Sequence, residues 1–133
     1  MSSFAGIRRL NRKSNQELLI TLLRLEFNSS SGLVTSESGI TAFAGGGQTG
    51  ATALTKRNNR IDTVASSGDS VKPNVNATVG FSILIQNNGA NNLDFFPAVG
   101  DTIVGNAINT AISIAAGNQA MLFCYTNSQL TLI

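Results

Sequence analysis

The alternation of apolar and polar residues changes character at about residue 50. From residue 51 onward, short runs of apolar and β-branched residues recur between clusters of Gly, Asn, Pro and Ser, a pattern typical of strands joined by turns. In the clearest run, residues 79–86, every odd position is apolar. Because side chains alternate between the two faces of a strand, these residues are predicted to face a core: Val79, Phe81, Ile83 and Ile85.

Further strands are predicted at 60–65, 92–96, 101–104, 111–115, 119–125 and 129–133. The breaks between strands fall at 66–69, 87–89, 97–100 and 116–118. Asn and Gly recur in the breaks, and both tolerate the positive φ of tight turns. Many short, evenly spaced strands predict a mainly β domain over residues 51–133, either a β-sandwich or a jelly-roll-like barrel.

Residues 1–50 have a different pattern. Residues 14–17 have the form of a capping box, with Ser at the cap and Glu three positions later. The leucines that follow fall on one side of a helix: Leu18, Leu19, Leu22 and Leu23. We expect a short amphipathic helix over about 14–26, followed over 28–50 by an extended Gly- and Ser-rich linker. Residues 1–50 are therefore expected to form a basic arm.

The charge distribution supports an arm with a partner of its own. The net charge is only +2, yet all nine basic residues lie within residues 1–72. Four of them cluster near the start of the chain: Arg8, Arg9, Arg12 and Lys13. Such a cluster predicts docking on an acidic protein surface or on nucleic acid phosphates. We favour the protein surface because Phe4 is the only aromatic residue near the cluster, so platforms for stacking bases are missing.

The second half of the chain is polar without being charged. Residues 73–133 contain ten Asn and no Lys or Arg. A surface of amides gives little electrostatic protection against self-association, which favours an oligomer. The apolar runs are far shorter than the roughly 20 residues of a membrane span. The basic cluster is not followed by the small-residue cleavage site of a signal peptide, so we expect neither membrane insertion nor export by that route.

Candidate chemistry is sparse. The chain has no His and a single Cys, Cys124, in an apolar run, where a small buried side chain is expected rather than a nucleophile. Residues 45–50 match G-x-G-x-x-G, but the β-patterned sequence downstream favours a linker over a dinucleotide site. The aspartates Asp62, Asp69, Asp94 and Asp101 match no calcium loop and are interpreted as turn residues, with a cation at a symmetry axis between subunits as the alternative. We therefore expect a non-enzyme without cofactor or metal.

Two linked segments carry a resemblance to a known class of proteins. Residues 87–91 read Asn-Asn-Gly-Ala-Asn, and residues 96–103 read Phe-Pro-Ala-Val-Gly-Asp-Thr-Ile. With neighbouring stretches over about 50–133, this pattern resembles a module that recurs in structural proteins of tailed-bacteriophage virions, among them decoration, head-fibre and fibre-like proteins. Relatives often end with a Trp in the last strand, whereas residues 129–133 here contain none.

The resemblance implies a structural protein of the virion, made in the host bacterial cytoplasm, and a homotrimer that contacts capsid or tail subunits. In this interpretation the basic cluster and the four leucines anchor the domain to the particle. Two alternatives stay open. One is a receptor- or glycan-binding fibre tip, which requires exposed aromatic residues or a groove in the 87–101 loops. The other is a nucleic-acid-binding protein that uses the basic arm.

Overall fold

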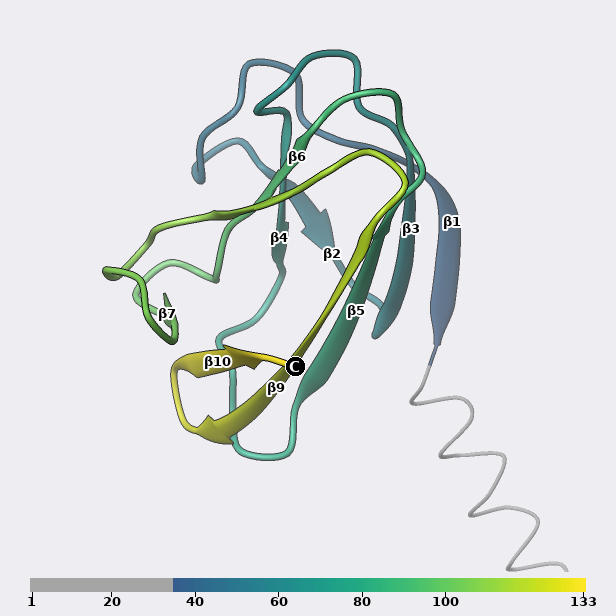
Figure 1. The fold of residues 1–133 in the computed structure, drawn as a ribbon. Coiled ribbons are helices and arrows are strands. Elements are labelled where there is room, and N and C mark those ends of the chain that lie inside the picture. The colour runs from purple at the N-terminus through teal and green to yellow at the C-terminus, as the bar shows by residue number, and fades with distance from the viewer. Residues whose placement is uncertain (1–34) are drawn as a thin grey trace, which may run out of the picture. The chain divides into compact units, whose positions relative to one another are not determined.

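The computed structural model describes residues 35–133, which form ten strands joined by turns and contain no helix (Figure 1). The predicted helix over about 14–26 lies outside the described residues. The prediction of a mainly β fold is confirmed for the part of the chain that the structure describes.

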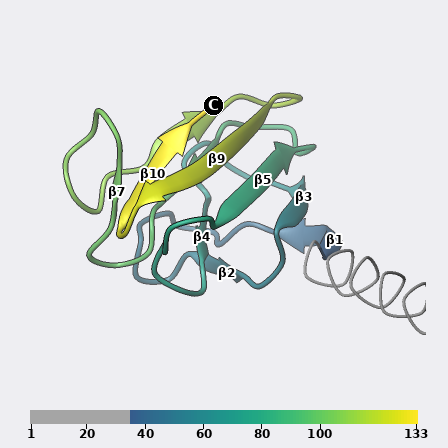
Figure 2. The same cartoon turned by 90° about the horizontal axis from the view of Figure 1, so that it is seen from below.

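The strands form two sheets. Sheet A has six strands in the order β1 (Ser36–Thr41), β3 (Asn58–Thr63), β5 (Ser82–Asn87), β9 (Gln119–Thr126), β10 (Gln129–Leu132) and β7 (Thr102–Ile103). Sheet B has four in the order β2 (Thr52–Leu54), β4 (Ser70–Pro73), β6 (Leu93–Phe95) and β8 (Ile112–Ile114). Figure 2 shows the strands of sheet A side by side in one layer, with β2 and β4 on one side of it.

The first six strands wind like a short β-solenoid. Successive strands alternate between the sheets, so each coil adds one strand to sheet A and one to sheet B. As a result β1, β3 and β5 pair in parallel, and so do β2, β4 and β6. This winding differs from the hairpin connections of a jelly roll. The sequence could not predict this winding, because turn residues mark where the chain bends but do not determine which sheet the next strand joins.

The last strands close the coils with antiparallel pairs. β8 pairs antiparallel with β6, and β9 pairs antiparallel with β5. The connection from β9 to β10 is the one hairpin between consecutive strands in the described residues. Ser128 takes a φ of 66° in its turn. These strands cover the C-terminal end of the parallel stack, where a fourth coil would otherwise begin.

The core lies between the two sheets. Sheet A contributes Ile61, Ile83, Ile85, Leu122 and Leu130, and sheet B contributes Leu54, Val71, Leu93, Phe95 and Ile114, all of them buried. The predicted inward orientation of Ile83 and Ile85 is confirmed. Phe81 is partly buried against the core, but Val79 is 64% exposed. Gly80, with a φ of 92°, places Val79 in a turn before β5 begins at Ser82.

Residues 35–50 differ from the extended linker expected over 28–50. They lie in the same compact unit as the other described residues and contain β1. Phe43 forms an antiparallel bridge with Ser70, and Ile40 and Ala42 are buried in the core. Strand β1 escaped prediction because its one buried position is Ile40 and its other residues are exposed. A mostly exposed edge strand carries no apolar alternation.

Candidate interaction surface

The eight residues predicted to anchor the chain lie outside the described residues: Arg8, Arg9, Arg12, Lys13, Leu18, Leu19, Leu22 and Leu23. Their roles stay predictions. The candidate surface described below comes from residues 35–133 alone.

Two of the four aspartates hold loops together. The Asp69 carboxylate accepts a hydrogen bond from the Ser66 backbone N–H at 3.1 Å, as expected for a turn residue. Asp101 is buried, and its carboxylate accepts bonds from the Asn76 side-chain amide at 2.9 Å and the Ala77 N–H at 2.7 Å. The bonds of Asp101 therefore join two loops about 25 residues apart, rather than stabilising a turn locally.

The other two aspartates lie in strands. Hydrogen bonds from the Asn88 side chain and the Gly39 N–H hold the pKa of Asp62 below its ordinary value, and Arg60 forms an ion pair with the same carboxylate at 2.9 Å. Partial burial raises the pKa of Asp94, on β6. In the part of the chain that the structure describes, no three His, Cys, Asp or Glu side chains gather in a way that could hold a metal ion.

Asparagine side chains act as internal hydrogen-bonding groups. Asn87 is fully buried, and its amide nitrogen donates to the carbonyls of Asn91 and Ile114, each at 2.8 Å. Its amide oxygen accepts from the Gly89 N–H at 3.0 Å. The Asn91 amide donates to Val64 O at 2.8 Å. Because Asn87 is on β5 and Ile114 on β8, this amide links sheet A to sheet B.

The glycine-rich segment 45–50 packs against sheet B. Gly47 O accepts a hydrogen bond from the Ser70 hydroxyl at 2.7 Å, and Gln48 O accepts one from the Lys72 ammonium at 2.9 Å. The element that follows is strand β2, whereas a dinucleotide-binding G-x-G-x-x-G requires a helix there. The segment is therefore an ordered loop within residues 35–133, which we call the β unit.

Cys124 is fully buried in the core, which confirms its interpretation as a small buried side chain. Its thiol lies 3.1 Å from the Thr126 carbonyl oxygen. Within residues 35–133, no helix is long and apolar enough to cross a membrane.

The outer face of sheet A carries a strip of apolar and aromatic side chains. On β9 the even residues Ala120, Leu122 and Cys124 are buried in the core, so the odd residues project outward. Tyr125 is 64% exposed and Met121 is 47% exposed. Phe123, partly exposed, lies between them in sequence, and its ring centroid is 4.5 Å from that of Tyr125.

Neighbouring strands extend this strip. Leu84 on β5 is directly opposite Met121. Ile133, just beyond β10, donates its N–H to Met121 O at 2.9 Å and is 68% exposed. Thr131 is opposite Phe123, so Ile133, two residues further on, has the same outward direction. We call this set the β9 face: Leu84, Met121, Phe123, Tyr125 and Ile133.

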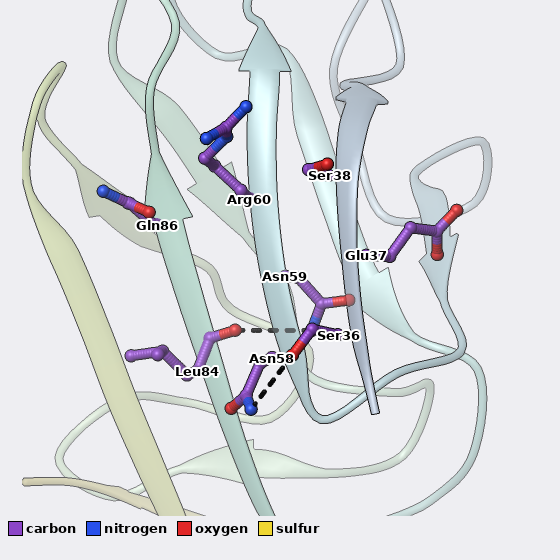
Figure 3. Close-up of a pocket in the computed structure, with 8 residues that line it drawn as sticks. All are labelled: Ser36, Glu37, Ser38, Asn58, Asn59, Arg60, Leu84 and Gln86. Atoms are coloured by element: carbon purple, nitrogen blue, oxygen red, sulfur yellow. Dashed lines mark hydrogen bonds between the residues drawn. The ribbon is translucent and has the colours of Figure 1, made fainter. Parts of the chain in front are cut away.

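A shallow polar pocket of about 300 Å³ lies beside the β9 face on the same sheet. Its lining comes from β1, β3 and β5 (Figure 3): Ser36, Glu37, Ser38, Asn58, Asn59, Arg60, Leu84 and Gln86. Asn59 donates its amide to Lys56 O at 2.9 Å and to Leu84 O at 3.3 Å. Its oxygen is buried and accepts no hydrogen bond from the described residues. Leu84 belongs to both the pocket and the β9 face.

The β9 face could not be identified from the residue pattern. Residues 120–125 are all apolar or aromatic, so both faces of the strand qualify equally as the buried one. The structure buries the face with Ala120 and Cys124 and exposes the one with the larger side chains.

A comparison of the chain with protein-family models finds no match, and comparisons with curated proteins and with solved structures find none either.

Proposed function

We propose that this chain is a structural component of a bacteriophage virion, such as a capsid decoration or head-fibre protein, and has no enzymatic activity. The β unit self-associates as a homotrimer. The basic cluster at 8–13 and the leucines at 18–23 anchor it to capsid or tail subunits. For the finer fold class we propose a two-sheet β-sandwich, wound as a solenoid over its first six strands, rather than a jelly roll.

The observation that carries this proposal is that the residues on which the phage resemblance rests make internal contacts within the fold. Asn87, Asn91 and Asp101 direct their side chains to internal backbone and amide partners. Gly89 packs so closely that an added Cβ would lie 2.8 Å from the Val64 backbone nitrogen. The resemblance therefore rests on residues that hold a fold together, which supports a structural role over a catalytic one.

The experiment is purification of particles of the phage that encodes the chain. We expect the chain to stay with the particles through density-gradient purification at a fixed copy number. A variant lacking residues 1–13 is expected to be lost from them while its β unit stays folded in solution. If the full chain remains entirely in the soluble fraction of the lysate, the virion assignment fails.

A second candidate function is binding of a glycan receptor. Sugar rings stack on exposed aromatic side chains, and the structure exposes Tyr125 and Phe123 beside a polar pocket on the same sheet. The fluorescence of Tyr125, the only tyrosine in a chain without tryptophan, gives a direct test. A saturable change on adding host surface polysaccharide, with binding absent in Tyr125→Ala by calorimetry, would favour this function. An unchanged signal would remove it.

A further inference from the structure

The β9 face has the composition of a protein–protein interface. Its centre is a tilted pair of aromatic rings, Phe123 and Tyr125, flanked by Met121. Aromatic residues and Met are enriched at the centres of interfaces, and charged residues are depleted there. The positions around it are amides and hydroxyls, which match a polar rim: Ser82, Gln86, Gln119 and Thr131.

The absence of charge on this face decides which partner fits. None of its five side chains is charged, and neither are the four polar side chains around it. By strand register Arg60 is opposite Gln86 and is already paired with Asp62. The backbone carbonyl of Arg57 accepts a hydrogen bond from the Leu84 N–H at 2.7 Å. Nucleic acid and anionic lipid surfaces are bound through Lys or Arg, so neither suits this face. A strongly charged protein would lose hydration there without gaining an ion pair.

A second copy of the same chain meets this requirement. It brings an equally apolar and aromatic strip, so two β9 faces can be buried together without leaving an unpaired charged side chain. The outer face of a sheet packs readily on another sheet face, and a three-fold axis along the strip brings together the copies of the proposed homotrimer. We propose that the β9 face is the surface through which copies of this chain associate, with Phe123 and Tyr125 at its centre. This inference rests on the self-association included in the proposed function.

The test compares Tyr125→Glu with Val99→Glu in the full-length chain. Both positions expose an apolar side chain by similar fractions, 64% and 62%, but Val99 is in the loop after β6, outside the β9 face. Light scattering over a concentration series gives the mass, and circular dichroism confirms that each variant is folded. We expect Tyr125→Glu to weaken association about 30-fold or more, as for residues at the centre of an interface, and Val99→Glu to keep the wild-type mass.

Tyrosine fluorescence gives an independent readout in the wild-type chain. Because Tyr125 is the only tyrosine and there is no tryptophan, quenching by acrylamide reports on this side chain alone. Quenching is expected to fall as the protein concentration rises through the association range. A Met121→Glu variant, also on the β9 face, is expected to abolish that concentration dependence.

The outcomes separate the two proposals. If wild type associates and Tyr125→Glu associates equally well, or if Val99→Glu dissociates just as readily, the β9 face is not the interface, although self-association stands. If wild type is monomeric at every concentration with constant quenching, both this inference and self-association in solution fail. The virion assignment is tested separately by the presence of the chain in purified particles.

Discussion

At the scale of single residues, a few buried polar side chains hold the two sheets together. Asn87 satisfies two carbonyls and one N–H from three different residues, and Asp101 joins the loop at 76–77 to the start of β7. A buried polar group that loses its partner carries the full cost of its desolvation. Substitutions at these residues should therefore cost more than the loss of one surface hydrogen bond.

We predict that Asn87→Ala lowers the free energy of unfolding by about 2–4 kcal/mol, because it leaves the Asn91 and Ile114 carbonyls and the Gly89 N–H unpaired. Asn88→Ala is the control, since Asn88 is exposed and bonds only to the Asp62 carboxylate through its side chain. It should cost less than about 1 kcal/mol. Urea denaturation of both variants measures the difference, and equal losses would contradict the role of Asn87.

Gly89 and Gly50 make a matched pair for close packing, because neither has a positive φ. A Cβ on Gly89 would meet the backbone nitrogen and Cβ of Val64 at 2.8 Å, and these atoms cannot move away. The three atoms nearest to a Cβ on Gly50 would all belong to the ring of Phe43, which is 41% exposed and can rotate outward. We expect Gly89→Ala to cost about 1–3 kcal/mol and Gly50→Ala clearly less, as measured by denaturant midpoints.

Asp94 makes stability depend on pH. Burial raises the pKa of this carboxyl in the folded protein, so the folded state binds the proton more tightly than the unfolded chain does. The ionised form therefore costs stability at neutral pH, and this cost disappears as the pH falls below the ordinary aspartate pKa of about 4. Asp94→Asn should raise the free energy of unfolding at pH 7, with a gain that vanishes near pH 3.

Asp101→Asn is expected to act in the opposite direction at pH 7. The Asp101 carboxylate accepts two hydrogen bonds, one on each oxygen, and an amide replaces one acceptor with a donor. This variant should therefore lower the free energy of unfolding. Denaturation curves of both variants at pH 7 and pH 3 provide the comparison. A stabilising effect of Asp94→Asn that is the same at both pH values would contradict the burial argument.

At the scale of elements, the solenoid winding gives β1 a structural role. Its partner β3 lies in the parallel ladder between β1 and β5, and the loop after β1 covers Ser70 and Lys72 on β4. Residues 35–50 therefore belong to the first coil and contact the second coil in both sheets. Edge strands of parallel sheets are otherwise left with unpaired backbone groups.

Two truncations test this structural role of residues 35–50. Removal of residues 1–50 deletes β1, the buried Ile40 and Ala42, and the carbonyls that bind Ser70 and Lys72, whereas removal of 1–34 deletes none of them. We expect the 51–133 fragment to be less stable than the 35–133 fragment by at least about 3 kcal/mol. Thermal unfolding of both fragments measures the gap, and equal midpoints would restore the linker interpretation of 35–50.

At the scale of the whole molecule, charge is unevenly distributed along the chain. Residues 73–133 carry only Asp94 and Asp101, whereas four cations fall within residues 8–13. The docking proposed for those cations should depend on ionic strength, because salt screens exposed charges. The apolar contacts proposed for the β9 face are not weakened in this way.

We predict that binding of the full chain to DNA-free particles weakens as salt rises from about 0.05 to 0.5 M, while the self-associated mass stays constant. Co-sedimentation and light scattering measure the two effects. The nucleic-acid alternative makes a different prediction, in which duplex DNA binds with a log–log salt slope of about −3.6 if each of the four cations contacts a phosphate. That slope, lost on deletion of residues 1–13, would displace protein docking as the role of the arm.

Local patterns in the residues were sufficient for several features. They predicted a mainly β fold, strands near the observed positions of β3 and β5 to β10, the inward direction of Ile83 and Ile85, and the burial of Cys124. Each depends on residues close together in the chain, such as the alternation in β5 or a Gly in a turn. The same reasoning located the turn at 87–89, where Asn87 accepts the Gly89 N–H. It missed the bond that Asn87 donates to Ile114 O, because Ile114 is 27 positions away in the chain.

The tertiary structure alone decided the winding of the coils, the inclusion of β1 in sheet A and the outward direction of the Tyr125 side chain. A turn signal is equally consistent with a return along one sheet and a crossing to the other, and only the burial of both sheets against a shared core selects the crossing. In the same way, a strand with two apolar faces does not specify which one is buried. That choice depends on the face whose side chains fit the opposite sheet, and for β9 it buries Ala120, Leu122 and Cys124 and leaves Tyr125 exposed.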